Sequence, residues 1–281
     1  MKWGNAMKIQ YLGTAAAEGI PAMFCHCEIC ERARKAGGRN IRTRSQTLID
    51  GKLNIDFPAD AYMHELQYGL NYADIRYYLF THIHEDHYYP LDFNYIYHGL
   101  GHVPEAHPGY DVYGSEDILP GLQTLEHSKD MDYLRLHSLT PYETADIGGY
   151  QVTPLRSNHG TPNPYSYVIS DGSRTILYLH DTGILPEASL HYLLNCGLHF
   201  DLVSYDCTGG NFEHLDYTSH LCFREIKEYT ALFRTRQLID DQSILVLNHF
   251  SHNSPDVNYD DRKVYEQYGY VMSYDGLTLT I

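Results

Sequence analysis

The stretch Thr81-His82-Ile83-His84-Glu85-Asp86-His87 decides how the rest of the chain is interpreted, because it places three imidazoles and a carboxylate within six residues. It follows the apolar run Tyr77 to Phe80, which is typical of a buried strand. A transition metal takes about three or four N, O or S donors, and imidazole with carboxylate suits Zn, Mn or Fe. Because these four donors exceed the needs of one tetrahedral ion, we expect two adjacent ions to share them.

Three further polar residues follow apolar runs that are typical of strands. His159 lies between the run Tyr150 to Leu155 and a proline, Asp181 follows Thr175 to Leu179, and His249 follows Ser243 to Leu247. Each of them alone is more often a residue of a turn or a satisfied core group. Because strand ends meet at one edge of a sheet, we expect these three residues to converge there.

The six cysteines are distributed unevenly. Cys25, Cys27 and Cys30 lie within six positions, whereas the other three are scattered singly. This pattern favours metal binding over disulfides, because three thiolates and one imidazole complete a tetrahedral zinc site. His26 is badly placed to be the imidazole, since it adjoins two of the cysteines. No helix-start context of the thioredoxin kind is evident at Cys27-x-x-Cys30, so a redox role is the weaker interpretation.

Length and charge narrow the classes of function. The 281 residues suffice for one large domain, and we expect residues 1–281 to form one, after a short extension over residues 1–6. The net charge is −16, so the surface field argues against a nucleic-acid partner. No apolar stretch approaches the roughly 18 to 20 residues of a membrane span, and the first residues lack the apolar core of a signal peptide. We therefore expect a cytoplasmic protein without a membrane partner.

Strands outnumber helices in the hydrophobic pattern. Further strands are predicted at residues 7–12, 46–49, 53–56, 111–113, 165–170 and 202–205, and a hairpin over 270–281 is centred on Asp275-Gly276. Helices are predicted from Pro58 to about Tyr68 and, capped by Asp216, from Tyr217 to about Phe233. Short strands in two sets with helices between them indicate an α/β (α+β) protein in which helices cover two layers of sheet.

The motif His82-x-His84-x-Asp86-His87 resembles the signature of the metallo-β-lactamase superfamily. Asn158-His159-Gly160, His180-Asp181-Thr182-Gly183 and Asn248-His249 follow in that family's order. The resemblance implies an αββα sandwich of two mixed sheets flanked by helices. It also implies that His82, His84 and His159 hold one ion, that Asp86, His87 and His249 hold the other, and that Asp181 bridges them. His180 and Asn248 depart from the small Ser or Thr, and from the Thr, that are common at these places.

The N-terminal region is similar to the branch of the superfamily that contains phosphoribosyl cyclic phosphodiesterase (PhnP). In that branch three Cys and a His three residues beyond the last catalytic His hold a structural zinc, which here implies Cys25, Cys27, Cys30 and His252. A His near a later helix contacts the phosphate in that branch, so His214 is our candidate and His220 its rival. Asp56 resembles a residue that orients the metal loop, although the usual following Gly is absent.

The function that we expect is metal-dependent hydrolysis of a small phosphodiester, cyclic in the related branch, by a metal-activated hydroxide. Asp86 and His214 are the catalytic candidates. The cofactors would be two divalent ions, Zn or Mn or else Fe, and one structural Zn. Alternatives are a tRNA-processing or other nucleic-acid phosphodiesterase, a thioesterase or lactonase, and a metal-binding scaffold without activity. The oligomeric state stays open, with a homodimer allowed.

Overall fold

The computed structural model of the chain describes residues 6–97, 99–104, 106–126, 133–216 and 218–281. Residues 1–5 of the extension that we expected lie outside this part. No helix of the described residues is both long enough and apolar enough to cross a bilayer.

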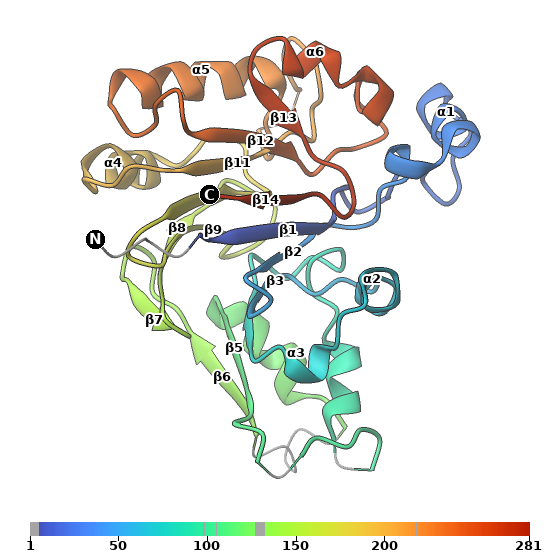
Figure 1. Cartoon of the computed structure of the whole chain (residues 1–281), viewed down its shortest axis with the longest axis vertical. Helices are drawn as coiled ribbons and strands as arrows, with labels where there is room; N and C mark the ends of the chain where they lie inside the picture. Colours follow the sequence, from blue (N-terminus) through green and yellow to red (C-terminus); the bar gives the residue numbers. More distant parts are fainter. Residues whose placement is uncertain (1–5, 98, 105, 127–132, 217) are drawn as a thin grey trace.

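Two seven-stranded mixed sheets lie face to face and form the centre of the molecule (Figure 1). The first sheet has the order β14-β1-β2-β3-β4-β5-β6 and the second the order β13-β12-β11-β10-β9-β8-β7. The strands have these bounds: β1 Lys8–Gly13, β2 Gln46–Ile49, β3 Leu53–Ile55, β4 Tyr77–Leu79, β5 Tyr110–Gly114, β6 Leu134–Ser138, β7 Ala145–Ile147, β8 Tyr150–Arg156, β9 Tyr165–Ser170, β10 Thr175–Leu179, β11 Leu202–Asp206, β12 Ile244–Asn248, β13 Tyr270–Met272 and β14 Thr278–Thr280.

Helices cover the outer face of each sheet, which confirms the expected αββα sandwich (Figure 1). Helices α4, α5 and α6 lie on the second sheet, and α2 and α3 lie on the first. The α-helices have these bounds: α1 Glu28–Ala36, α2 Ala61–Tyr68, α3 Leu119–Gln123, α4 Glu187–Asn195, α5 Phe223–Thr235 and α6 Lys263–Glu266. Short 3-10 helices complete the chain: η1 Gly38–Asn40, η2 Tyr72–Asp74, η3 Pro90–Ile96, η4 Glu116–Ile118 and η6 Tyr259–Asp261.

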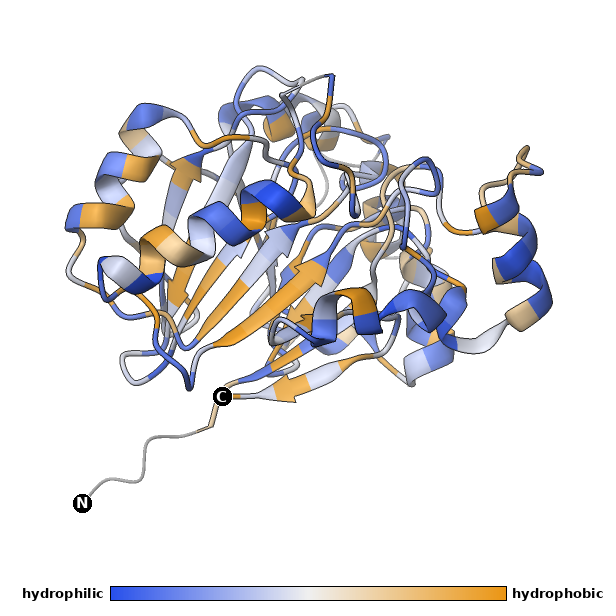
Figure 2. Ribbon diagram, turned by 90° about the horizontal axis from the view of Figure 1, so that it is seen from above, coloured by the Kyte–Doolittle hydropathy of each residue, from blue (hydrophilic) through white to orange (hydrophobic). Residues whose placement is uncertain are grey.

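Strand β10 shows why the layers stack in this way. Its side chains alternate between two cores: Ile176 and Tyr178 pack between the sheets, while Leu177 and Leu179 pack under the helices. Because all its residues are buried, the strand reads as a continuous apolar run. Figure 2 shows such apolar strands, in orange, beneath helices that carry hydrophilic residues.

The C-terminal hairpin that we predicted is wrong. Strand β13 pairs in parallel with β12 in the second sheet, whereas β14 pairs antiparallel with β1 in the first. The turn between them crosses from one sheet to the other. Its Asp275 accepts hydrogen bonds from Thr14 Oγ1 and from the Thr43 amide, each over 2.6 Å, so contacts with the loop between β1 and β2 hold the turn.

Helix α5 begins at Phe223, six residues after the predicted start, and Tyr217 lies outside the described residues. A capping box between Cys222 and Glu225 starts the helix there. Residues 218–222 are instead loop that approaches the ends of the strands. Helices α1, α3, α4 and α6 and strands β6 and β7 have no counterpart among the predicted elements.

We expect Leu177→Ala to lower the free energy of unfolding by about 2 to 5 kcal/mol, because it leaves a cavity in the core under the helices. Urea denaturation measures the change. Leu66→Ala is the matched control, since the side chain of Leu66 on α2 is 66% exposed and its loss should cost less than about 0.5 kcal/mol. Equal losses in the two variants would contradict this account of the core.

Candidate metal centre

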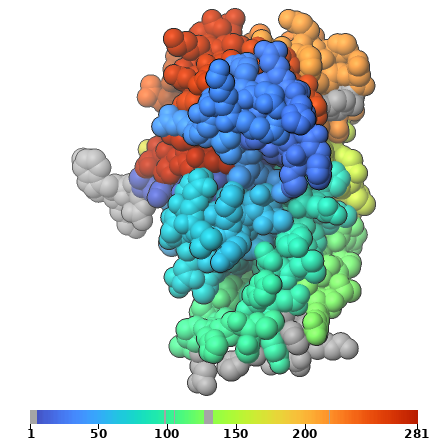
Figure 3. Space-filling model, turned by 90° about the vertical axis from the view of Figure 1, so that its right-hand side faces the viewer, coloured from blue at the N-terminus to red at the C-terminus, as the bar shows by residue number. Residues whose placement is uncertain are grey.

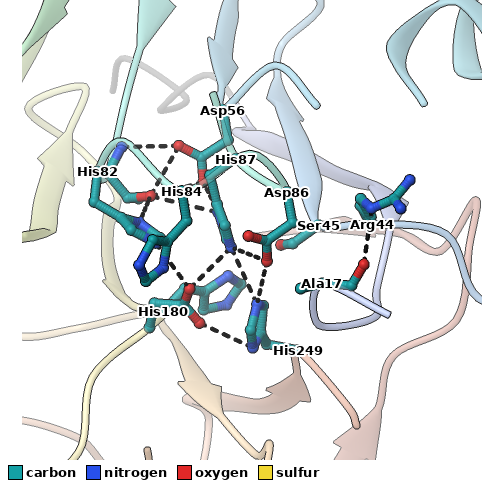
Figure 4. Close-up of polar contacts among 12 residues, drawn as sticks. Ala17, Arg44, Ser45, Asp56, His82, His84, Asp86, His87, His180 and His249 are labelled. Atoms are coloured by element: carbon teal, nitrogen blue, oxygen red, sulfur yellow. Dashed lines mark hydrogen bonds and ion pairs between the residues drawn. The ribbon is translucent and has the colours of Figure 1, made fainter. Parts of the chain in front are cut away.

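Residues from both sheets meet at one edge of the sandwich (Figure 4). The loop after β4 carries His82, His84, Asp86 and His87, and the segments after β8, β10 and β12 bring the three residues that we expected to converge. The backbone of Asp181 and of His249 adopts positive φ, 46° and 60°. Non-glycine residues rarely adopt this conformation, so the chain turns sharply here to aim these side chains inward.

The first group of donors consists of His82, His84, His159 and Asp181, whose ligand atoms all lie within 4.8 Å of one another. His159 Nε2 lies 2.9 Å from His84 Nδ1, and His82 Nε2 lies 3.2 Å from Asp181 Oδ2. The other ring nitrogen of His159 is 3.2 Å from the carbonyl oxygen of Ser219. A bond to that carbonyl leaves Nε2 of His159 as the atom that can hold an ion.

The second group consists of Asp86, His87, Asp181 and His249. His87 Nε2 lies 3.0 Å from Asp181 Oδ2 and 3.1 Å from both Asp86 Oδ2 and His249 Nε2. His249 Nδ1 lies 2.9 Å from Asp181 Oδ1. Asp181 is therefore common to the two groups. It also belongs to a further group of donors, together with Asp206, His220 and His249.

The arrangement of the donor atoms suits metal coordination better than hydrogen bonding among the donors. His82 Nε2 and Asp181 Oδ1 are buried and have no hydrogen-bond partner among the described residues, although each lies close to another donor. Donors bound at about 2.0 to 2.3 Å around a tetrahedral ion lie about 3.3 to 3.8 Å apart. The observed spacings of about 3 Å approach that value, and N and O donors of this kind suit divalent transition metals.

Without a bound cation, protons on histidines supply the positive charge of the centre. Burial disfavours the charged form of His249, but Asp181 and Asp86 outweigh burial and raise the pKa of His249 to about 10. Asp181, Asp86 and Asp56 likewise raise the pKa of His87 well above its usual value, again against burial. Burial, assisted by His87, lowers the pKa of His82 to about 3. A metal ion must displace the protons of His87 and His249, so metal binding weakens as the pH falls.

Asp56 holds the metal loop from below. It is fully buried at the end of β3, has positive φ of 62°, and its Oδ1 accepts the amide hydrogen of Thr81 over 2.8 Å. Its Oδ2 lies 2.7 Å from His87 Nδ1, which leaves Nε2 of that ring for an ion. Phe57 stands where the related branch has Gly, and its amide donates to the carbonyl of His87. Asp56 thus lies where we expected an orienting residue.

The prediction from sequence missed Asp206 and Thr208 as parts of the site. Asp206 ends β11, between the strands that precede Asp181 and His249, and its Oδ2 lies 2.8 Å from His220 Nδ1. Thr208 Oγ1 lies 2.8 Å from His249 Nδ1. A polar residue directly after the predicted strand 202–205 was the signal that could have identified Asp206.

His214 does not lie in the cavity at the two groups. Its side chain is 67% exposed and its Nε2 lies 3.3 Å from Asp216. The cavity has a volume of about 320 Å³, and His220 is among the residues that line it. Of the two histidines that we weighed, the structure therefore brings His220 to the donors, with its Nδ1 3.8 Å from Asp181 Oδ1.

His180 and Asn248, the two departures from the family pattern, lie next to each other. Asn248 Nδ2 is 3.4 Å from His180 Nδ1, and His180 Nε2 is 2.7 Å from Ser204 Oγ. Both side chains are fully buried, and burial lowers the pKa of His180 well below its usual value. The pair joins the ends of β10 and β12 directly behind Asp181 and His249.

The second predicted site also comes together. The ligand atoms of Cys25, Cys27, Cys30 and His252 lie within 4.8 Å of one another, and His252 Nδ1 is 3.5 Å from both Cys25 Sγ and Cys27 Sγ. This spacing matches the edge of a tetrahedral zinc site, about 3.6 Å for S and N donors. Figure 3 shows the segment that bears these cysteines, in blue, against the C-terminal segment in red.

The sequence shows no helix-start context of the thioredoxin kind at Cys27-x-x-Cys30, but a helix does begin there, because Cys27 is the N-cap of α1. Burial opposes ionisation of Cys27, but His252 and the neighbouring donors outweigh it and lower the pKa of Cys27 to about 6. Burial raises the pKa of Cys30 to about 12. The third thiol and the imidazole beside the pair distinguish this cluster from a simple redox dithiol, since all four are zinc ligands.

Comparisons with known proteins agree with this architecture. A model of the beta-lactamase superfamily domain matches residues 56–250. Zinc-bound PqqB from Methylobacterium extorquens superposes with a TM-score of 0.76 at 19% identity, covering 98% of this chain and 100% of that chain. A diphosphatase from the PhnP family superposes with a TM-score of 0.72 at 20% identity, covering 99% of this chain and 98% of that chain. Human short-form tRNase Z superposes with a TM-score of 0.63 at 15% identity, covering 97% of this chain and 98% of that chain. At such identities the likeness is one of fold.

Among curated proteins, an octanoyltransferase of Porphyromonas gingivalis is 24% identical to this chain over 260 residues. The aligned part covers 89% of this chain and 47% of that protein. The chain thus spans about half the length of the curated relative that it matches.

We expect Cys30→Ser to lose about one zinc ion per chain, because a fully buried ligand of the four-donor cluster is removed. Metal analysis after dialysis against a weak chelator measures the loss. Cys196→Ser, which removes a thiol outside the cluster, should keep the wild-type zinc content. Equal zinc contents in the two variants would refute a zinc site at this cluster.

Proposed function

The chain belongs to the metallo-β-lactamase superfamily of hydrolases, as its motifs predicted, and on that premise we propose that it hydrolyses a small phosphodiester. The observation that carries the proposal is that Asp181 belongs to two adjacent groups of donors. A paired site of this kind can clamp both the attacking and the leaving oxygen of an in-line displacement at phosphorus.

The proposal takes its metal ligands from the two groups of donors. His82, His84 and His159 would hold one ion, Asp86, His87 and His249 the other, and Asp181 both. Two divalent ions, Zn or Mn or Fe, would act as Lewis acids on the phosphoryl oxygens and lower the pKa of bound water toward about 7. Cys25, Cys27, Cys30 and His252 would hold a separate structural zinc that ties the first loop to the segment after β12.

His220 is the residue that we propose as the acid for the leaving oxygen, in place of His214. It lines the cavity, and Asp206 behind it orients the ring through a 2.8 Å contact. Burial disfavours the imidazolium, but Asp206 outweighs burial and raises the pKa of His220. The raised pKa favours the protonated ring, which can give its proton to an alkoxide.

A nucleic-acid substrate finds little support in the charges. The net charge is −16, and no Lys or Arg is among the described residues that line the metal cavity. Proteins that bind nucleic acids present Lys and Arg to the phosphates. The likeness to tRNase Z is therefore one of fold.

The octanoyltransferase relative suggests acyl chemistry as a second candidate, for which an apolar pocket beside the metals would be needed. A cavity of about 730 Å³ does exist, and aromatic side chains such as Phe57, Tyr78 and Phe93 line it. None of its lining residues lines the metal cavity. The two spaces are separate, so the phosphodiester remains the better supported substrate.

Hydrolysis of bis-p-nitrophenyl phosphate and of ribose 1,2-cyclic phosphate by the metal-loaded protein tests the proposal. We expect turnover of both compounds and a loss of at least about 100-fold in kcat for Asp181→Asn, which removes the carboxylate common to both groups. Glu85→Gln is the control, since Glu85 is an exposed residue of the same loop. Cleavage of an octanoyl thioester or of a lactone without cleavage of either phosphodiester would refute the proposal.

The role of His220 predicts a dependence on the leaving group. We expect His220→Gln to slow hydrolysis of an alkyl ester by about 100-fold, and that of a p-nitrophenyl ester far less, because p-nitrophenolate leaves without a proton. As an acid His220 must be protonated, so the wild-type rate with alkyl esters falls as the pH rises through its raised pKa. Asp206→Asn removes the group that raises this pKa and should move that fall to lower pH.

His214→Gln is the matched control for the acid and should leave rates and pH profile unchanged. Equal slowing of both classes of ester by His220→Gln would assign the ring to substrate positioning and would contradict its role as an acid.

A further inference from the structure

The outer wall of the metal cavity includes five residues, from two segments, that are not themselves donors of the paired site. Ala16, Ala17 and Glu18 come from the loop after β1, and Ser251 and Asn253 from the segment after β12. Asn253 Nδ2 donates to Glu18 Oε1 over 3.2 Å. A carboxylate and an amide therefore stand together at the mouth of the cavity.

The loop that carries Glu18 is held from several sides. The amide of Ala16 donates to the carbonyl of Phe250, and the amide of Gly19 donates to the carbonyl of Ala16. Arg44 Nε donates to the carbonyl of Ala17 over 2.8 Å, and Figure 4 shows this contact beside Asp86 and His249. The position of Glu18 is thus fixed by the backbone on both sides of it.

No Lys or Arg among the described residues lines the cavity and offsets Glu18. Arg44, which supports the loop, already forms an ion pair of 3.0 Å with Asp60. Three carboxylates line the cavity, those of Asp86, Asp181 and Glu18, and Glu18 alone among them lies outside the two groups of metal donors. Its negative charge is therefore free to act on a substrate at the mouth of the cavity.

A narrower inference rests on the phosphodiesterase function proposed above. We propose that the cavity selects small diesters with a single negative charge, and that Glu18 with Asn253 imposes this selection. The carboxylate repels a second phosphate group on the substrate and accepts hydrogen bonds from hydroxyl groups, while the amide donates to an alcohol or ring oxygen. The substrate class is then a monoanionic diester of a polyhydroxylated alcohol.

Two compounds that differ in one phosphate group test the selection: ribose 1,2-cyclic phosphate and 5-phosphoribosyl 1,2-cyclic phosphate. At low salt we expect kcat/KM of the full-length, metal-loaded protein to be about 10-fold higher for the former. Glu18→Gln should reduce this ratio to about 3-fold or less, and so should added salt, which screens an exposed carboxylate. Asn253→Ala should raise KM for ribose 1,2-cyclic phosphate by about 5-fold and leave kcat unchanged.

Glu187→Gln is the matched control, because it removes the same charge from an exposed position on α4, and its ratio should equal that of the wild type. Equal or faster turnover of the 5-phosphorylated compound by the wild type, or an unchanged ratio in Glu18→Gln, would overturn the inference.

Failure of the proposed function has a different signature, in which neither compound is hydrolysed. Calorimetric dissociation constants of the two compounds for the metal-loaded protein then measure the selection directly. Tighter binding of ribose 1,2-cyclic phosphate, with the difference reduced in Glu18→Gln, would sustain the inference, and equal constants would overturn it.

Discussion

The buried carboxylate of Asp181 lies between two groups of histidines, and the surrounding structure keeps it there. Its oxygens lie about 3 Å from His82, His87 and His249. Such a cluster of polar atoms is costly in a protein interior unless charges and hydrogen bonds are satisfied. Protons on two histidines meet this need in the absence of cations, and divalent ions would meet it more completely. Stability and metal binding are therefore linked at one point.

The support for this arrangement comes from residues directly behind the donors. Asp56 holds the amide of Thr81 and the ring of His87, Thr208 lies against His249, and Asp206 lies against His220. His180 and Asn248, which depart from the family pattern, are compatible because their side chains face each other. The His180 ring stands where a small side chain is common, and it contacts the Asn248 amide, which stands where Thr is common. Hydrogen bonds at this distance from a metal commonly set ring orientation and affinity.

The cysteine cluster brings together the loop after β1 and the segment after β12, and other residues of both line the metal cavity. His252 follows His249 by three residues, and Asn253 at the mouth is the next residue along the chain. A zinc ion held by Cys25, Cys27, Cys30 and His252 would restrain the loop after β1 and the segment after β12 together. The proposed structural metal and the proposed selectivity of the mouth thus depend on the same two loops.

Sequence alone determined the local parts of this protein. Residues 82–87 lie close together in any fold because they are neighbours in the chain, and the apolar runs before His159, Asp181 and His249 identified strand ends, since burial on both faces imposes that pattern.

Only the tertiary structure decided which distant groups meet. His214 and His220 belong to one loop, and packing of that loop against Asp206 brings His220 inward. The segment after residue 270 has the pattern of a hairpin, yet its two strands find partners in different sheets. Periodicity reports which faces are buried, but the choice of partner depends on contacts between residues far apart in the chain, which no local pattern encodes.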